Sequence, residues 1–70
     1  MKNFITLTNL ENRQIIINPS YIIYIEEQIN GSYIRFSNDV KINVGESLSE
    51  IMELINKSKH IKNKNYDKNN

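Results

Sequence analysis

Few side chains of this chain have the type and spacing that catalysis or metal binding requires. Glu26 and Glu27 are adjacent in an apolar stretch typical of a β-strand, where successive side chains point to opposite faces. The two carboxyls therefore cannot act together as a general acid and a general base. His60 is the only histidine, and no acidic or cysteine residue stands at ligand spacing from it. Ser47 is explained as a helix cap. We expect no enzyme activity, no metal site and no cofactor.

Length and composition point to one small domain with a modest core. The chain has 70 residues, a formal net charge of +1 and no cysteine, which excludes disulfides and thiolate chemistry. Its longest aliphatic run, Ile15 to Ile17, is far shorter than the ~20 residues that cross a bilayer. The mixed residues after Met1 and Lys2 do not resemble a secretory signal. We expect a cytoplasmic protein without a membrane span, and self-association would stabilise so small a domain.

The elements that must position any functional surface begin with a central hairpin. Asn30-Gly31 predicts a type I′ turn, because both residues tolerate positive φ. Counting outward from this loop pairs Ile29 with Ser32, Gln28 with Tyr33, Glu27 with Ile34, Glu26 with Arg35, and Ile25 with Phe36. This register sets an apolar pair on one face and an opposite-charge pair on the other, and a shift by one residue loses both.

Three further strands flank this hairpin. Residues 4–8 and 14–17 alternate or are β-branched, and an odd loop with Asn12 in the left-handed region pairs Leu7 with Ile15 and Ile5 with Ile17. Pro19 ends the second strand. Residues 40–44 form the last strand, after a turn with Asn38 or Asp39 at positive φ. The register of this turn pairs Phe36 with Val40 and Ile34 with Ile42. The expected inward set is Ile5, Leu7, Ile15, Ile17, Ile25, Ile34, Phe36, Val40, Ile42 and Val44, plus Ile22 or Ile23.

A helix follows the strands. Ser47 and Glu50 form a capping box, and Leu48, Ile51, Met52 and Ile55 recur on one helical face. The predicted fold is α+β, a five-stranded curved antiparallel β-meander with one C-terminal helix packed on it. Residues 1–58 form the β-meander plus helix domain, and residues 59–70 are expected to be a flexible, basic, Asn/Lys-rich tail.

The second face of the sheet is predicted to be apolar. Phe4, Ile16, Tyr24 and Tyr33 alternate with the inward residues and therefore point away from the helix. An Ile-, Phe- and Tyr-rich surface on so small a domain is typical of a protein interface, although scattered surface apolar residues are also normal. We expect these four residues to contact a second copy of the chain or another protein.

The basic C-terminal segment gives an alternative. Through Asn56 the chain has four basic and seven acidic side chains, a net charge of −3, whereas from Lys57 onward the net charge is +4. Lysines attract phosphates, so Lys57, Lys59, Lys62 and Lys64 are the candidate nucleic-acid contacts. The segment contains no arginine and only one aromatic residue, which favours a solubilising terminus. The two interpretations remain open.

Several short motifs resemble a known family. They are Ile5-x-Leu7-Thr8-x-Leu10, Ile17-Asn18-Pro19, Ile22-x-x-Ile25-Glu26-Glu27, Asn38, and Val44-x-Glu46-Ser47-x-x-Glu50-Ile51. In these residues the chain resembles the FlbD-like (SwrD-like) small proteins associated with bacterial flagella and swarming. The resemblance covers nearly everything before the basic segment. It implies a motility-related role and brings no catalytic residues.

A second resemblance is partial. Residues 21–51 are similar to the first half of LytTR DNA-binding domains, but the later DNA-contact segment of that family is absent. The sequence as a whole therefore predicts a small non-catalytic accessory protein that acts through protein-protein contact. A small regulatory nucleic-acid binder that uses the basic C-terminal segment is the alternative.

Overall fold

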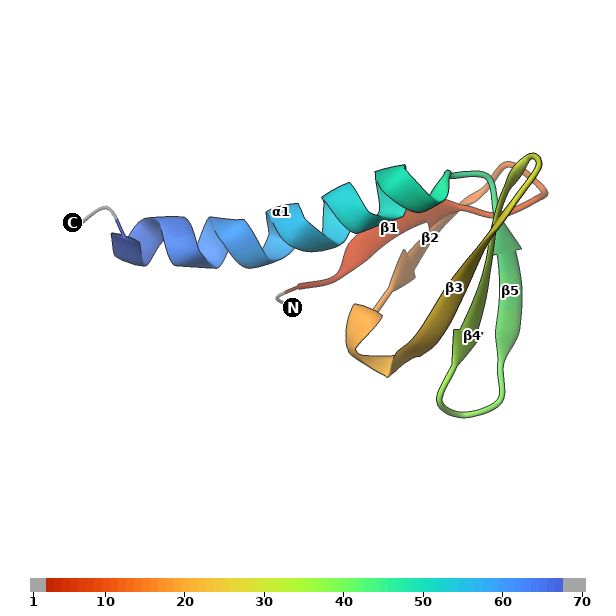
Figure 1. Ribbon diagram of the computed structural model, residues 1–70, viewed down its shortest axis with the longest axis horizontal. Helices are drawn as coiled ribbons and strands as arrows, with labels where there is room; N and C mark the ends of the chain where they lie inside the picture. Colours follow the sequence, from red (N-terminus) through yellow and green to blue (C-terminus); the bar gives the residue numbers. More distant parts are fainter. Residues whose placement is uncertain (1–2, 68–70) are drawn as a thin grey trace.

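Residues 3–67 form five strands followed by one long helix (Figure 1). The computed structural model describes residues 3–67, with side chains through Ser58. The elements are, in order, β1 (Ile5–Thr8), β2 (Gln14–Ile17), a 3-10 turn η1 (Pro19–Tyr21), β3 (Ile22–Gln28), β4 (Gly31–Phe36), β5 (Lys41–Val44) and α1 (Leu48–Asp67). The predicted α+β class is confirmed.

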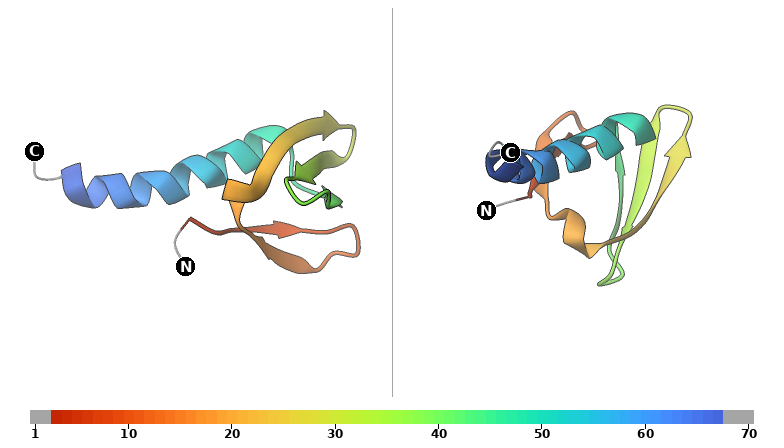
Figure 2. Two further views of the ribbon diagram at one scale, coloured as in Figure 1. Left: turned by 90° about the horizontal axis from the view of Figure 1, so that it is seen from below. Right: turned by 60° about the vertical axis from the view of Figure 1, so that its left-hand side comes forward.

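The strands form two sheets instead of one continuous meander. β1 pairs with β2, and β3, β4 and β5 form a separate antiparallel sheet. The break lies at η1, where the Asn18 side chain accepts a hydrogen bond from the Ser20 N–H at 3.0 Å and Pro19 begins the turn. This short helical turn prevents a β2–β3 hairpin, so β3 starts a new sheet on the other side of the core (Figure 2).

The first hairpin has the predicted register. Ile5 lies opposite Ile17 and Leu7 opposite Ile15. Asn12 is left-handed, with φ 66°, as the odd loop requires. The Asn9 side chain stabilises the turn by accepting hydrogen bonds from the backbone N–H groups of residues 11 and 13, each 2.9 Å long.

The predicted register of the central hairpin is wrong by two residues. The turn is formed by Ile29 and Asn30, and Gly31 is already the first residue of β4, opposite Gln28. Consequently Ile25 lies opposite Ile34, not Phe36, and Glu26 lies opposite Tyr33, not Arg35. A shift of two residues leaves every side chain on its predicted face, so alternation alone could not detect it.

Gly31 is required here for a reason other than a type I′ turn. Its φ is +143°, and a Cβ at this position would overlap the carbonyl oxygen of Val44 on β5. The absence of a side chain therefore lets the start of β4 pass close to the end of β5. Beside it, Ser32 is buried, and its hydroxyl donates to the Glu46 carbonyl at 2.9 Å.

A β-bulge settles which isoleucine at the start of β3 faces the core. The pairing changes register between Ile22, which lies opposite Phe36, and Tyr24, which lies opposite Arg35. The extra residue, Ile23, is exposed, whereas Ile22 is half-buried and packs against the core. The bulge therefore lets Ile22 and Ile25 both face inward, which strict alternation does not allow.

The β4–β5 hairpin has the predicted register. Ile34 lies opposite Ile42, and the Phe36 N–H donates to the Val40 carbonyl at 2.8 Å. Of the two residues proposed for positive φ, Asp39 adopts it, with φ 71°.

The two sheets are joined at one corner. The Gly45 N–H donates to the Thr8 carbonyl at 2.8 Å, and Asn9 forms an isolated antiparallel bridge with Val44. Inward side chains from both sheets and from α1 then share one core, whose buried residues are Ile5, Leu7, Ile17, Ile34, Val44 and Ile51.

The helix begins as predicted and continues further. The Ser47 N–H donates to the Glu50 carboxylate at 2.8 Å, and the Glu50 N–H donates to the Ser47 hydroxyl at 3.2 Å, which confirms the capping box. Ile51 is fully buried, and α1 packs on β1 and β3. The backbone stays helical through Asp67, and the second half of α1 extends away from both sheets (Figures 1 and 2). The domain boundary at residue 58 stays a prediction. Flexibility of residues 59–70 stays a prediction.

Candidate functional site

The four predicted interface residues divide between the two sheets. Phe4 and Ile16 belong to the β1–β2 side, and Tyr24 and Tyr33 lie on β3 and β4. The two tyrosine rings are neighbours, with centroids 6.3 Å apart and planes tilted by 41°. Because the inner faces of the two sheets meet in one core, their outer faces point apart. The predicted single patch is therefore two separate patches.

The residues considered for chemistry do not assemble into a site. Glu26 and Glu27 lie opposite Tyr33 and Ser32, respectively, on alternate faces of β3. Ser47 is engaged in the capping box. Among the side chains that the structure describes, residues 3–58, no group of three acidic, histidine or cysteine residues is placed to hold a metal ion.

The predicted nucleic-acid contacts are all on α1. Lys57 is exposed. Lys59, Lys62 and Lys64 belong to the projecting half of the helix, and their side chains, like that of His60, lie outside the part of the chain whose side chains are described. Nucleic-acid binding by these lysines therefore stays a prediction.

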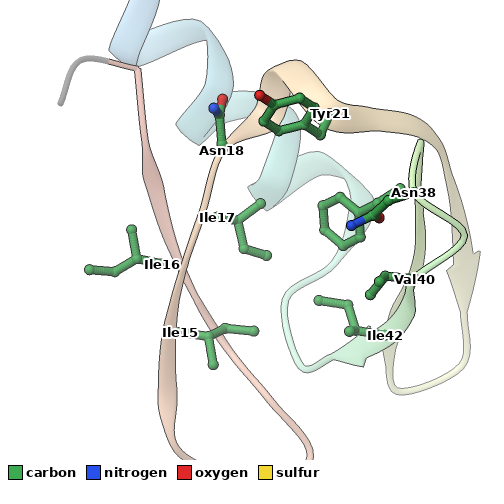
Figure 3. Close-up of a pocket in the computed structure, with 9 residues that line it drawn as sticks. Ile15, Ile16, Ile17, Asn18, Tyr21, Asn38, Val40 and Ile42 are labelled. Carbon is green, nitrogen blue, oxygen red and sulfur yellow. The ribbon is translucent and has the colours of Figure 1, made fainter.

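An apolar cleft lies between the two sheets, and we call it the inter-sheet cleft. Its volume is about 270 Å³. Figure 3 shows Ile15 and Ile17 of β2 pointing toward Val40 and Ile42 of the β4–β5 hairpin, whereas the Ile16 side chain points away. The complete lining is Ile15, Ile16, Ile17, Asn18, Tyr21, Phe36, Asn38, Val40 and Ile42.

The cleft is open because α1 covers a different side of the core. The sheets are held together near Thr8 and Gly45, at the ends of β1 and β5, and α1 packs on β1 and β3. Of the elements within residues 3–67, none fills the space between β2 and the β4–β5 hairpin, so Val40 is exposed and Ile15 and Ile42 are only half-buried. The expectation that Val40 is a core residue is therefore wrong.

The chemistry of the lining is uniform. All nine residues belong to the described part of the chain, and none of them carries a formal charge. Aliphatic side chains and one phenylalanine form the walls, while two asparagines and Tyr21 supply polar groups. Such a surface suits an uncharged apolar segment with a few hydrogen-bonding groups.

Sequence reasoning missed the inter-sheet cleft because it placed all five strands in one sheet. In that arrangement the helix would cover Ile15, Phe36 and Ile42. The available signal was Asn18-Pro19-Ser20, which was recognised as a strand end but equally marks a change of sheet. Side-chain alternation tells which face of a strand is apolar, but it does not tell which element covers that face.

A second apolar surface lies at the tips of two hairpins. Leu10 and Ile29 are both exposed, Ile29 almost completely at 96%, and they line the same open hollow. Ile29 is exposed because it occupies the turn itself, as a consequence of the corrected register.

Together the fold and these surfaces define a small α+β protein with two sheets, one helix and an open apolar cleft. Residues 4–62 match the FlbD family, described as flagellar and swarming motility proteins. Because this match spans most of the chain, the protein belongs to that family, and the sequence resemblance is confirmed.

The partial resemblance to LytTR domains stays an interpretation. No curated protein and no solved structure matches the chain. Within residues 3–67, no helix has the length and apolar character needed to cross a membrane.

Proposed function

We propose that this protein is a non-catalytic accessory protein of flagellar or swarming motility that works in the cytoplasm by binding protein. The observation that carries the proposal is the inter-sheet cleft, which gathers exposed and half-buried apolar side chains into one uncharged surface. The motility assignment rests on the family match.

The distribution of apolar residues supports binding as the activity. Among the described residues, six hydrophobic side chains are buried and nine large ones are exposed. Burying one such side chain completely is worth about 1.5–3 kcal/mol, so this chain leaves unused a large part of the free energy its side chains could provide. A binding partner would recover that free energy.

The exposed residues are also grouped. Two of the nine side chains, those of Tyr21 and Val40, line the inter-sheet cleft, where half-buried Ile15, Phe36 and Ile42 continue the apolar surface. The remaining exposed residues lie at the hairpin tips, on the outer sides of β2 and β3, before β1 and on the helix. The inter-sheet cleft thus joins exposed and half-buried apolar side chains into one surface that a single partner could cover.

The test is complementation of motility. A flagellated bacterium that lacks its own FlbD-family protein would receive this chain, the variant Val40→Asp, or the control Ile23→Asp. Val40 is at the mouth of the cleft, whereas Ile23, which is similarly exposed, lies at the bulge of β3 outside it. We expect Val40→Asp to reduce the swarming rate and Ile23→Asp to leave it unchanged, with equal thermal stability of both purified variants.

Two outcomes would contradict the proposal. Full complementation by Val40→Asp would remove the cleft as the binding site. An unchanged swarming rate when the native chain is absent would remove the role in motility. Salt-sensitive retention on immobilised DNA or RNA that is lost on deleting residues 57–70 would instead support the nucleic-acid alternative.

A further inference from the structure

Strand β2 has a free edge beside the inter-sheet cleft. Within the described residues its sheet contains only β1 and β2. The Asn9 N–H donates to the Arg13 carbonyl, while the N–H and carbonyl of Thr8 bond away from β2, to Glu46 and Gly45. In an antiparallel ladder the bonded and non-bonded pairs alternate, so the residue opposite Thr8, Gln14, directs its backbone groups outward.

By the same alternation, Ile16 directs its N–H and carbonyl to the free edge. Ile15 and Ile17 direct theirs to β1 and their side chains into the cleft (Figure 3). Asn18 continues the extended backbone, with φ −93° and ψ 106°. Residues 14–17 therefore present the donors and acceptors that another extended strand pairs with, whereas the Asn18 carbonyl already accepts from the Tyr21 N–H at 3.2 Å.

This edge lacks the features that usually protect a sheet edge. Natural edge strands carry charges, prolines or bulges that prevent pairing with another chain. Both edges of the three-stranded sheet have them, because β3 contains a bulge and two glutamates and β5 contains Lys41. At the other edge of the two-stranded sheet, the N–H and carbonyl of Thr8, at the end of β1, already bond to Glu46 and Gly45. Residues 14–18 contain no charge, no proline and no bulge, and Ile16 is 64% exposed.

We propose that the β2 edge is covered by a second copy of this chain, which pairs β2 with β2 antiparallel about a two-fold axis at Ile16. The inference rests on the proposed function and names the partner at that same site. Ile16 lies opposite Ile16 of the second copy, Gln14 opposite Asn18, and Ile15 opposite Ile17. The two β1–β2 hairpins become one four-stranded sheet.

The distribution of charged residues favours self-pairing at the β2 edge over self-pairing at β3 or β5. An isologous contact brings each surface against itself, so a charged edge meets its own charge across the two-fold axis. Glu26 and Glu27 disfavour such pairing at β3, and Lys41 disfavours it at β5. At β2 the closest charged residue is Arg13, which in this register lies opposite Pro19 of the second copy. No like charges meet.

The pairing also extends the inter-sheet cleft. Ile15 and Ile17 point into the cleft, and in the dimer each lies opposite the other residue in the second copy, so the apolar walls of two clefts become continuous. A four-residue strand is nevertheless a small interface, well below the ~800 Å² per partner of stable complexes. The dimer is therefore in concentration-dependent exchange.

Sedimentation with matched variants tests the pairing. Ile16→Lys sets two lysines against each other at the two-fold axis, whereas Ile23→Lys places the same charge on an isoleucine of β3 that is also more than half exposed. Measurements up to about 1 mM protein detect even a weak dimer, because a Kd of about 1 mM corresponds to a binding free energy of about −4 kcal/mol. We expect the native chain and Ile23→Lys to dimerise and Ile16→Lys to stay monomeric. A monomeric native chain, or a dimer that Ile16→Lys leaves intact, would overturn the inference.

Disulfide cross-linking tests the register of the β2–β2 pair, and it does not require the fold to accept a lysine at position 16. The chain has no cysteine, so a single one can be introduced cleanly. Directly opposed, hydrogen-bonded residues have Cα atoms about 5.5 Å apart, within reach of a disulfide. Ile16→Cys forms a covalent dimer under mild oxidation. The control Thr6→Cys, on the neighbouring strand, is separated from its copy by about 14 Å, three strand spacings, and does not. Equal cross-linking of the two would refute the register.

Failure of this inference can be told apart from failure of the proposed function. In one case the native chain is monomeric, the Ile16→Cys variant forms no covalent dimer, and the Ile16→Lys variant still fails to complement swarming. Self-pairing is then overturned, and a strand of another protein occupies the edge. If the native chain dimerises but neither Ile16→Lys nor Val40→Asp affects swarming, the dimer stands and the proposed function fails.

Discussion

The carboxylate of Glu46 accepts two hydrogen bonds from Thr8, one from its backbone N–H and one from its hydroxyl, each 2.9 Å long. Thr8 ends β1, and Glu46 lies in the short segment between β5 and α1. The pair therefore fastens the two-stranded sheet to the point where the three-stranded sheet leads into the helix. The residues are 38 positions apart in the chain.

Glu46→Ala is expected to destabilise the fold by about 2 kcal/mol, because it removes two hydrogen bonds to a charged acceptor and leaves the part-buried Thr8 N–H unpaired. Thr8→Val keeps the N–H bond and is expected to cost about 1 kcal/mol. Urea unfolding measures both. Glu53→Ala, an exposed helix carboxylate, is the control, with an expected change within about 0.5 kcal/mol. Equal values for Glu46→Ala and Glu53→Ala would show that the contact is not stabilising.

Substitution by alanine should affect the stability strongly at Gly31 and only weakly at Gly45. Gly31→Ala places a Cβ against the Val44 carbonyl at φ +143°, and we expect a loss of more than about 3 kcal/mol or failure to fold. At Gly45 the nearest atom to a new Cβ is the Thr8 carbonyl oxygen, 3.8 Å away, and φ is not in the left-handed region. Gly45→Ala should change the stability by less than about 1 kcal/mol. Thermal unfolding measures both variants. A Gly31→Ala variant as stable as the native chain would show that the start of β4 does not pass close to the Val44 carbonyl.

Packing of α1 on the sheets can be tested with two adjacent helix residues, one buried and one exposed. Ile51 is fully buried, whereas Met52 is 43% exposed. Ile51→Ala is expected to cost about 2–5 kcal/mol through lost burial and a cavity. Met52→Ala removes a side chain of similar size from the surface and should cost less than about 1 kcal/mol. Because alanine favours the helix at both positions, the difference in urea midpoint isolates packing. Similar midpoints would mean that α1 does not pack through Ile51.

The ion pair in the β4–β5 turn should contribute little. Arg35 donates to the Asp39 carboxylate at 2.6 Å, but the Asp39 side chain is 79% exposed. Asp39→Asn keeps a residue that tolerates positive φ and removes the charge, so we expect a loss of at most about 1 kcal/mol that shrinks as salt is added. Asp39→Val, which is β-branched, should cost more at any salt concentration. A large, salt-dependent loss for Asp39→Asn would show that this pair is stabilising.

Features set by neighbouring residues were predictable from the sequence. Asn12 and Asp39 adopt positive φ, the two odd loops have the expected register, and Ser47 and Glu50 bond reciprocally. Each depends on the conformational preference of a residue or on a contact over a few positions. The apolar faces of the strands also followed from alternation, because a strand has a period of two.

The central hairpin shows where this reasoning fails. Asn30-Gly31 correctly marked a turn region, but a two-residue shift satisfies the same alternation. The observed register places Gly31 under the Val44 carbonyl and lets the Ser32 hydroxyl reach the Glu46 carbonyl. Both contacts are with the chain beyond β4. The register was therefore decided by packing between strands and not by the turn residues.

The candidate site illustrates the same limit on a larger scale. The sequence by itself determined which side chains are apolar, which face of each strand carries them, and where the helix begins. Only the tertiary structure decided that η1 divides the strands into two sheets, that α1 covers β1 and β3, and that Ile15, Val40 and Ile42 line an open cleft. The reason is physical: alternation fixes the side of a strand, but which element buries that side depends on contacts between residues far apart in the chain.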